Sequence, residues 1–557
     1  MTETTSITLN DRLKCDLEMI INQGFNPLRG FLNKNDYQSV LKNMTLTTGE
    51  LWPMPITLPI TAEQAGLLKH QDTVVLKDIT GLPLAEMDIS SSNSIFPYSW
   101  NEEANAIFGC DDDNHPYTNI LKTQWEEGNI YYIGGPIKQL RPIPKYDFED
   151  YRLTPQETKQ YFKDNGWTKV IGFQTRNPMH RSHYELTKYA LNIAGDDAKV
   201  LLHPVVGVTQ PGDVNYHTRV RCYIELLNYY SENTAKLSLL PLSMRMAGPR
   251  EAVWHAIIRK NYGCTHFVVG RDHAGPSFKK KNGESFFGPY DAQDLLMKHA
   301  EQIGIQVITS KLIVYATPKD SSLSPIYTPI DQVDSDKYNI HQISGTQQRN
   351  MLANGEELPE WFTFPEVYKI LRDEFKLPHQ KGLCLYFVGL SGSGKTTLAK
   401  FVENKIRELY PTKQITYLDG DIVRTNLSKG LGFTKTDRSL NVRRIGYVAS
   451  LVVKHDGICI TANIAPYLED RKVNYELIKE NGNMVQIWIN TPLSECENRD
   501  IKGLYKLARS GVIKQFTGIS DPFEEPTESD IILDGTLDLE VLAKQVIDYL
   551  KEKKYCL

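Results

Sequence analysis

An eight-residue stretch, GLSGSGKT (389–396), carries the most specific chemical pattern in the chain. It fits G-x-x-x-x-G-K-[ST], in which backbone N–H groups close around phosphate oxygens and the following helix adds a partial positive charge. A strand-like run at 383–390 precedes it and a helical pattern follows. A glycine-rich turn without a ligand is the alternative, but this context favours a nucleotide site. The expected ATP contacts are Gly389, Ser391, Gly392, Ser393, Gly394, Lys395, Thr396 and Thr397.

Carboxylates and arginines follow this loop. Asp419 and Asp421 come after a strand-like run, ITYL, at the edge of a sheet where ligands bind. One carboxylate could hold Mg²⁺, and the other could accept a proton from a substrate hydroxyl. Groups suited to oxyanions and to a flat base come next: Arg424, Phe433, Arg438, Asn441, Arg443 and Arg444. Taken singly, each is more often a solvated surface residue than a ligand.

A second candidate site is QTRNPMHRSH (174–183), in which His180 and His183 are three residues apart. A zinc site would need a third ligand, and the H-E-x-x-H pattern is absent. Arg176 and Arg181 oppose a cation and favour an anion. Spacing alone leaves open phosphate binding, an ordinary core or surface histidine and, least favoured, a metal site. A turn between a strand and a helix is where phosphates bind, which favours the first.

Parallel α/β units are needed to position both sites. Strand-like and helical runs alternate through the middle of the chain, at 168–173, 183–195, 198–207, 250–263 and 264–270. A second α/β unit starts near residue 377. The first 147 residues mix short apolar runs with Pro, Gly and Asn, a pattern typical of a mostly β module with some helix, and the proline-rich 141–148 predicts a connector.

Composition narrows the functional classes. The length of 557 residues predicts three or four domains. The net charge of -5 gives no indication of a protein that binds nucleic acid or a membrane surface. None of the eight cysteines forms a C-x-x-C pair, so a cysteine-based zinc site is not expected. The polar N-terminus lacks the apolar segment of a signal peptide, and no apolar run is long enough to cross a bilayer. The expected location is the cytoplasm.

The residues after 380 resemble adenylylsulfate kinase in GLSGSGKTT, LDGDIVR, GLGF, DRSLNVRRIG, IAPY, KGLYKLARSG and FTGISDPFE. The resemblance implies transfer of phosphate from MgATP to the 3′-hydroxyl of adenosine 5′-phosphosulfate. It implies catalytic roles for Lys395, Asp419 and Asp421 and metal contacts from Thr396 and Asp419. Sulfonucleotide contacts are expected from Asp421, Arg424, Phe433, Arg438, Asn441, Ile464, Ala465, Lys502 and Phe516.

One position departs from part of that family. Some members have serine in the I-x-P-Y stretch, where a phosphoserine has been proposed, but this chain has Ala465. Alanine has no nucleophile, so a covalent intermediate is excluded there. Direct in-line transfer is therefore predicted, with catalysis supplied by positioning and charge neutralisation.

The first two thirds resemble ATP sulfurylase over roughly residues 15–375. The spacing of the histidines is similar to the HxGH signature of nucleotidyltransferases, with Ser182 in place of the glycine. The narrower match comprises QTRNPMHRSH, TQPGDVNYHTRVRCY, LPLSMRMAGPREAVWHAIIRKNYG, VGRDHAGP and ISGTQQR. The implied reaction joins ATP and sulfate to give adenosine 5′-phosphosulfate and pyrophosphate.

By this resemblance, sulfate binds to Gln174, Arg176 and the backbone of Ala274. Catalysis at the α-phosphoryl group is assigned to Thr175, Arg176 and Asn177. The ATP-binding set is Gln174, Thr175, Arg176, Asn177, His180, His183, Gly270, Arg271, Asp272, His273 and Val314, with the two HxxH histidines on the β- and γ-phosphates.

Plainer interpretations stay open for several residues. Asp272 could only fix a loop, and His273 could cap a helix or pack. His255, inside AVWHAII, is expected to be a packed helix histidine, and the acidic run at 111–113 a solvated loop.

The expected fold is α/β and multidomain. Its parts are a PUA-like β-rich module (1–147), a Rossmann-like nucleotidyltransferase domain (148–310), a small sulfurylase subdomain (311–376) and a P-loop kinase domain (377–557). The predicted function is synthesis of adenosine 5′-phosphosulfate followed by its 3′-phosphorylation, with Mg²⁺ bound alongside ATP. The family implies a homo-oligomer, either a dimer or a hexamer.

Three alternatives differ in class. In some relatives the kinase-like domain is an inactive allosteric module, but the glycines and Lys395 of the phosphate loop are intact here. A dissimilatory enzyme running the first step backward would lose its substrate to an active kinase. A protein that only binds fits least well, because both sites carry complete transfer machinery.

Overall fold

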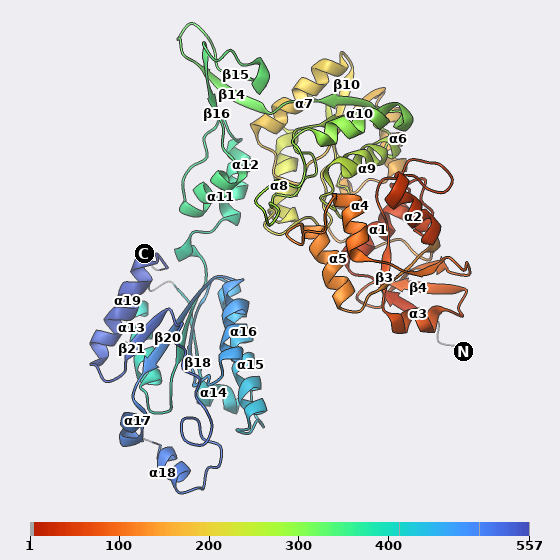
Figure 1. The fold of residues 1–557 in the computed structure, drawn as a ribbon. Coiled ribbons are helices and arrows are strands. Elements are labelled where there is room, and N and C mark those ends of the chain that lie inside the picture. The colour runs from red at the N-terminus through yellow and green to blue at the C-terminus, as the bar shows by residue number, and fades with distance from the viewer. Residues whose placement is uncertain (1–4, 411–412, 501, 556–557) are drawn as a thin grey trace. The chain divides into compact units, whose positions relative to one another are not determined.

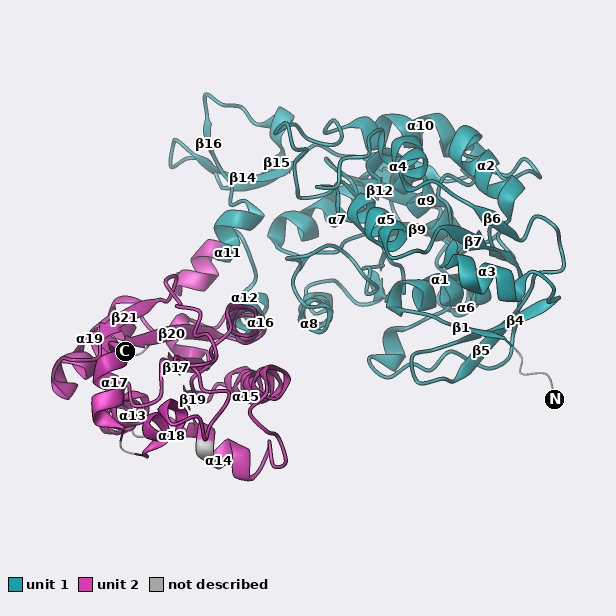
Figure 2. Cartoon of the chain, turned by 60° about the horizontal axis from the view of Figure 1, so that its bottom comes forward, with its two compact units in different colours: residues 1–349, 357–374 teal, residues 350–356, 375–557 magenta. Residues whose placement is uncertain are grey.

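The computed structural model describes residues 5–410, 413–500 and 502–555, except for the side chain of Asp421. The chain forms two compact units, shown in Figure 2. Unit 1 comprises residues 1–349 and 357–374, and unit 2 comprises 350–356 and 375–557. Among the described residues, no helix is both long and apolar enough to span a membrane.

The N-terminal part of unit 1 contains a five-stranded sheet of order β1-β4-β5-β8-β2 and a three-stranded sheet of order β3-β7-β6. Its helices α1 to α5 give it more helix than the short apolar runs of the sequence indicate. The elements are β1 Ser6–Thr8, α1 Asp11–Ile21, β2 Gly30–Phe31, α2 Lys34–Asn43, β3 Leu58–Ile60, α3 Ala62–Leu68, β4 Thr73–Lys77, β5 Pro83–Asp88, β6 Ile95–Pro97, α4 Trp100–Phe108, α5 Pro116–Glu126, β7 Tyr131–Ile133 and β8 Gly135–Gln139.

The middle of unit 1 is built on a parallel sheet of order β11-β10-β9-β12-β13. The strands alternate with helices, as the sequence predicts, and helix α7 ends at Gly195, whose positive φ of 83° suits a residue without Cβ. The elements are η1 Glu149–Tyr151, α6 Pro155–Asp164, β9 Lys169–Phe173, α7 Arg181–Ala194, β10 Ala198–Leu202, α8 Tyr216–Leu227, β11 Ala235–Leu237, α9 Gly248–Asn261, β12 His266–Val269, α10 Asp291–Ile303 and β13 Gln306–Thr309.

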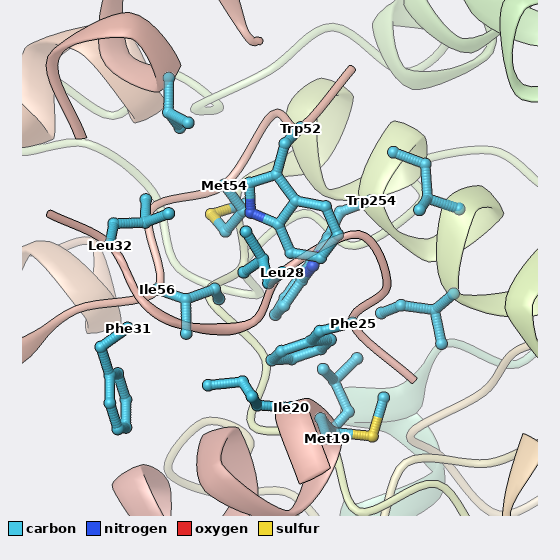
Figure 3. Packing of buried hydrophobic residues seen from close by; sticks show 14 of the residues in the cluster. Met19, Ile20, Phe25, Leu28, Phe31, Leu32, Trp52, Met54, Ile56 and Trp254 are labelled. Carbon is cyan, nitrogen blue, oxygen red and sulfur yellow. The ribbon is translucent and has the colours of Figure 1, made fainter. Parts of the chain in front are cut away.

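Helix α9 is buried on almost every side, from Gly248 to Arg259. Its Trp254 lies 5.2 Å, centroid to centroid, from Phe25, which in turn lies 5.7 Å from Trp52. Figure 3 shows these rings packed together with Leu28 and Met54. The N-terminal module and the parallel sheet therefore share one apolar core, and α9 is fixed within it.

A small antiparallel sheet of order β15-β14-β16 ends unit 1. Strand β14 packs against α7, and α12 packs against α8. The elements are β14 Ile313–Pro318, β15 Ile326–Pro329, η2 Ile330–Gln332, β16 Tyr338–His341, α11 Gly345–Asn354 and α12 Pro365–Glu374. Helix α11 begins in unit 1 and ends in unit 2.

Unit 2 is a parallel sheet of order β18-β19-β17-β20-β21. Helices α13 and α19 cover one face, and α15 and α16 cover the other (Figure 1). The elements are η3 Pro378–Gln380, β17 Leu383–Val388, α13 Lys395–Leu409, β18 Ile415–Asp419, α14 Gly420–Thr425, α15 Lys435–Lys454, β19 Ile458–Ala462, α16 Leu468–Lys479, β20 Asn483–Asn490, α17 Leu493–Arg499, α18 Leu504–Arg509, β21 Ile531–Asp534 and α19 Leu539–Glu552.

Candidate active sites

In unit 1, the candidate residues gather where the chain changes direction across the sheet. After β9 the chain adds β10 and β11 on one side, then returns to add β12 on the other side of β9. Loops that follow neighbouring strands at such a switch point form ligand sites. The loops after β9 (174–180) and after β12 (270–277) meet here, because Nη2 of Arg176 donates to Ser277 Oγ at 3.3 Å.

Arg176 forms an ion pair that the sequence did not reveal. Its Nη1 donates to both carboxylate oxygens of Asp213, at 2.5 and 2.7 Å. Both side chains are largely buried, so solvent screens the pair weakly. Asp213 lies in TQPGDVNYHTRVRCY, one of the stretches that resemble ATP sulfurylase, and this was the only sequence feature that could have marked it as a site residue. An oxyanion that binds Arg176 must share the guanidinium with this carboxylate.

The neighbours of Arg176 are held by hydrogen bonds within the same region. The Thr175 hydroxyl accepts from the backbone N–H of Asn177 at 3.1 Å, and Tyr223 donates to the Asn177 carbonyl at 2.7 Å. Gln174 accepts from Arg259 at 2.5 Å. The backbone of this turn is therefore fixed before any substrate arrives.

The two HxxH histidines lie at the start of α7, where His180 is the N-cap. His180 is buried, with Nδ1 3.0 Å from Thr363 Oγ1 and Nε2 3.1 Å from Gln348 Oε1. Burial lowers the pKa of His180 to about 3 and that of His183 to about 4. Both rings are therefore neutral near pH 7. Their predicted contact with phosphate remains a prediction, and His180 would have to exchange one of these hydrogen bonds to make it.

The loop after β12 has an unusual backbone. Asp272 and Ala274 adopt φ values of 52° and 56°, a left-handed conformation that non-glycine residues seldom take and that tends to cluster at functional sites. The side chain of Asp272 pairs with Arg271 at 3.3 Å in an exposed position. His273 contacts His255, with Nε2 3.1 Å from Nδ1.

His255 is packed inside α9, as the sequence predicts, and it holds the loop through His273. Gly270 directly follows β12, and Val314 is buried on β14, the strand that packs against α7. The acidic run at 111–113 is more structured than a solvated loop. Asp113 forms ion pairs with Lys122 and Lys281, and Asp112 accepts from the Lys281 backbone N–H at 2.8 Å.

In unit 2, the phosphate loop connects β17 to α13, as its pattern predicts. Gly389, Gly392 and Gly394 adopt φ values of 151°, 75° and 101°, which favour glycine. Lys395 folds back and donates to the carbonyl of Leu390 at 2.6 Å. Burial lowers the pKa of Lys395 to about 8, and nearby phosphate charge would favour its protonated form.

Two oxygen groups beside the loop fit a magnesium ion. The Thr396 hydroxyl, at the start of α13, donates to a carboxylate oxygen of Asp419, at the end of β18, at 3.4 Å. Mg²⁺ takes hard oxygen ligands and usually combines one or two carboxylates with substrate phosphates. The side chain of Asp421 lies outside the described part of the structure, so its expected catalytic role remains a prediction.

A cavity of about 850 Å³ joins the phosphate loop to the predicted sulfonucleotide residues. Its lining includes the loop from Ser391 to Thr397 and Asp419. It also includes all of the predicted sulfonucleotide contacts whose side chains are described: Arg424, Phe433, Arg438, Asn441, Ile464, Ala465, Lys502 and Phe516. One site therefore contains both predicted groups of residues.

Contacts around this cavity suit an anionic nucleotide. The Arg424 guanidinium lies 4.4 Å from the centroid of the Phe433 ring, which is largely exposed. Arg438 is buried and donates to the carbonyls of Phe433 and Gln515 at 2.8 and 2.6 Å. The side-chain oxygen of Asn441 is buried and has no hydrogen-bond partner among the residues that the structure describes, which leaves an acceptor for a ligand.

Sequence reasoning missed other residues of the lining, including Asn463, Arg499, Asp500, Gln515, Thr517 and Leu537. Arg499, at the end of α17, donates to the carbonyl of Gly535 at 3.0 Å. Asn463 directly precedes the recognised IAPY stretch, which was a usable signal. Arg499 and Leu537 lie outside every recognised stretch, so only the fold could place them here.

Three family models match successive parts of the chain. They are described as PUA-like domain (residues 1–142), ATP-sulfurylase (149–374) and adenylylsulphate kinase (381–534). Sulfate adenylyltransferase of Gibberella zeae is 43% identical over 532 residues, covering 95% of this chain and 90% of the relative. That of Emericella nidulans is 43% identical over 555 residues, covering 99% and 94%.

A solved structure described as a hexameric APS kinase from Thiobacillus denitrificans is also similar. It has a TM-score of 0.77 and 27% identity, and the match covers 100% of this chain and 94% of that one. The expected multidomain α/β fold and both expected enzyme domains are thus confirmed. The chain belongs to the sulfate adenylyltransferase family and carries an ATP-sulfurylase domain followed by an adenylylsulfate kinase domain.

Proposed function

We propose that unit 1 makes adenosine 5′-phosphosulfate from ATP and sulfate, and that unit 2 phosphorylates its 3′-hydroxyl with a second ATP. The observation that supports the kinase reaction of unit 2 is the cavity shared by the phosphate loop and the predicted sulfonucleotide residues. An intact phosphate loop, with Lys395 and Thr396, lines the same space as Arg424, Phe433 and Arg438. The phosphate donor, ATP, and the acceptor, adenosine 5′-phosphosulfate, would thus bind at adjacent positions in one cavity.

In the first step, a sulfate oxygen attacks the α-phosphorus, and the bond from that phosphorus to the departing pyrophosphate oxygen breaks. Sulfate is fully ionised at neutral pH, so the step needs no general base. It needs positioning of two polyanions and donors for the developing negative charge. Arg176, at the junction of the two loops, is the residue we assign to both tasks, with Thr175 and Asn177 beside it.

In the second step, the 3′-oxygen attacks the γ-phosphorus, its proton passes to a carboxylate, and ADP departs. We assign the proton to Asp421 and the phosphate contacts to Lys395. Mg²⁺ held by Thr396 and Asp419 would neutralise charge on the phosphate oxygens. Ala465 lines the cavity and has no nucleophilic atom, which supports direct transfer. Accordingly, no phosphoenzyme should form with γ-labelled ATP.

The full chain tests both assignments. With MgATP and sulfate it should catalyse sulfate-dependent exchange between pyrophosphate and ATP. With MgATP and adenosine 5′-phosphosulfate it should release ADP and the 3′-phosphorylated product. Arg176→Ala should slow the first reaction at least about a hundredfold, as does loss of one oxyanion donor in other enzymes. Near-normal exchange in Arg176→Ala would refute its role.

A second candidate for unit 2 is a regulatory module. Fungal relatives that match nearly the whole chain, unit 2 included, are named only as sulfate adenylyltransferase. If unit 2 only regulates, the full chain will give no ADP from adenosine 5′-phosphosulfate and MgATP while exchange proceeds normally. We favour the kinase, because the phosphate loop and the cavity are both intact.

We also propose a homo-oligomer, since the structural relative is described as hexameric. Light scattering after size exclusion would distinguish a dimer or hexamer from the 63.5 kDa chain, and a monomer would contradict the proposal.

A further inference from the structure

Arg259, near the end of α9, is fully buried, yet it forms no ion pair among the described residues. Its Nε and Nη1 atoms have no hydrogen-bond partner there. Buried Arg245 provides a contrast, because it donates to both carboxylate oxygens of Asp16 at 2.8 and 2.7 Å. An unpaired buried charge is expensive, so its presence calls for a reason.

The position of Arg259 beside the candidate sulfate residues offers a reason for burying its charge. Its Nη2 donates to the Gln174 side-chain oxygen at 2.5 Å and to the His203 carbonyl at 3.0 Å. These residues directly follow β9 and β10, at the ligand edge of the sheet. Glycine inside β9 makes room for it: a Cβ on Gly172 would lie 2.7 Å from Arg259 Cγ. Glycine usually weakens a strand interior, so here it serves the close approach of Arg259.

No carboxylate among the described residues pairs with Arg259. Glu251, on the same helix, favours its charged form only from a distance, because the Glu251 carboxylate accepts from the backbone N–H groups of Arg245 and Ala247 at 3.0 and 2.7 Å. Arg176 is matched by Asp213 at 2.5 Å. Burial, together with the Arg259 guanidinium, holds the pKa of His203 and His255 well below the usual value, so those rings carry no charge. Arg219 is also buried without an ion pair among the described residues, but its Nη1 donates to the backbone carbonyls of Arg176 and Val205. Arg259 instead holds a side chain assigned to sulfate.

The hydrogen bond to Gln174 also fixes the orientation of that carboxamide. A guanidinium can only donate, so the atom facing it must be the oxygen of Gln174. The Nε2 group then points elsewhere, and within the described part of the chain its one hydrogen bond is to the weak acceptor Met244 Sδ at 3.7 Å. Its N–H groups are thus kept for a stronger acceptor such as an oxyanion.

We propose that Arg259 is a positioning residue for sulfate: it locks the Gln174 carboxamide with its N–H groups toward the anion, and its unpaired charge is neutralised only when the dianion binds. This inference rests on the proposed sulfate site in unit 1. It assigns the sulfate affinity of that site partly to a residue that makes no direct contact with the substrate.

Steady-state kinetics of the full chain test the proposal. Arg259→Met keeps the aliphatic stem but removes the charge and the donor. We expect its KM for sulfate to rise at least about tenfold while its KM for ATP stays within about twofold, because loss of one hydrogen bond to a charged group is worth roughly that much. Arg259→Lys keeps the positive charge but lacks the planar guanidinium with its several donors. Its KM for sulfate should lie between those of the wild type and Arg259→Met. The increase in melting temperature that sulfate gives the wild type should shrink in both variants.

Arg250 is the matched control. It lies on the same helix, and burial lowers the pKa of Arg250 and of Arg259 alike to about 10. The Arg250 guanidinium, however, donates to the backbone carbonyls of Val40, Leu41 and Pro53. Arg250→Met should lower the melting temperature and leave the KM for sulfate unchanged.

A double-mutant cycle with Gln174→Ala separates positioning from general damage. If Arg259 acts largely through Gln174, Arg259→Met should raise the sulfate KM of Gln174→Ala by a clearly smaller factor than it raises that of the wild type. Effects that multiply in the double variant would overturn the proposal. So would sulfate KM values within twofold of wild type in both Arg259 variants. Absence of sulfate-dependent exchange in the wild type would instead refute the proposed function itself.

Discussion

Acid should weaken unit 1 through His115, the N-cap of α5. The ring is fully buried, and its Nδ1 accepts from the backbone N–H groups of Tyr117 and Thr118 at 3.3 Å. Nε2 must then donate to the carbonyl of Met246, 3.0 Å away. Protonation would place a hydrogen on Nδ1 and break the cap. The structure therefore requires the neutral ring.

The size of the effect follows from the pKa. Burial lowers the pKa of His115 from 6.5 to about 4. Between these values the unfolded chain binds the proton and the folded chain does not, so stability falls as pH falls. The slope from this residue is about 1.4 kcal/mol per pH unit, and the whole loss by pH 4 is about 3 kcal/mol. His180, with a pKa of about 3, adds a slope of the same sign.

Tryptophan fluorescence reports mainly on the unfolding of unit 1, the unit that contains His115. Of the seven tryptophans, six lie in unit 1: Trp52, Trp100, Trp125, Trp167, Trp254 and Trp361. Urea titrations of the full chain at pH 7.5, 6 and 5, followed by this signal, would report the stability of unit 1. His115→Asn keeps a good N-cap and removes the titrating group, so its stability should fall less steeply with acid.

His115→Ala is the control. It removes both the cap and the titrating group, so it should be less stable than His115→Asn at pH 7.5 yet share its shallower slope. The reasoning fails if either variant keeps the wild-type dependence on pH, because the slope would then arise elsewhere.

Three further predictions concern single features. Lys395→Met should reduce phosphorylation of adenosine 5′-phosphosulfate about a hundredfold or more, while sulfate-dependent pyrophosphate exchange by the same preparation stays unchanged. Gly172→Ala should destabilise unit 1 by about 1–3 kcal/mol in urea titrations, because its Cβ would meet Arg259 Cγ at 2.7 Å; an unchanged midpoint would show that α9 can shift. Added zinc, or a zinc-selective chelator at fixed Mg²⁺, should leave the exchange rate unchanged, since the described residues contain no group of three metal-ligating side chains; inhibition by the chelator would restore the metal interpretation of His180 and His183.

Local patterns predicted much of this molecule. The phosphate loop needs only one strand, one turn and one helix, so its sequence sufficed to place Lys395 and Thr396. Alternating strand and helix patterns likewise predicted both parallel sheets. The helices of the N-terminal module were underestimated, because short amphipathic segments such as α3 look like turns beside apolar strand-like runs.

Contacts between distant segments could not be predicted. His180 is held by Gln348 and Thr363, which lie 168 and 183 residues further along the chain. No spacing rule connects such partners. The same applies to Asp213, which contacts Arg176 from 37 residues away. It also applies to Arg259, whose lack of an ion pair with any described residue is visible only once the fold is known.

The division of the chain near residue 350 has a consequence for dissecting the protein. Unit 1 contains the chain up to residue 349, and residues 350–356 belong to unit 2. Residues 357–374 belong to unit 1 again, and all residues from 375 onward belong to unit 2. That returning piece carries Thr363, which holds His180, and α12, which packs on α8. A sulfurylase fragment cut at the first crossing would therefore lose part of its own site, whereas one extended through residue 374 would keep it. The chain thus crosses between the units three times, after residues 349, 356 and 374, so a single proteolytic nick within 350–356 would leave each fragment with a segment that belongs to the other unit.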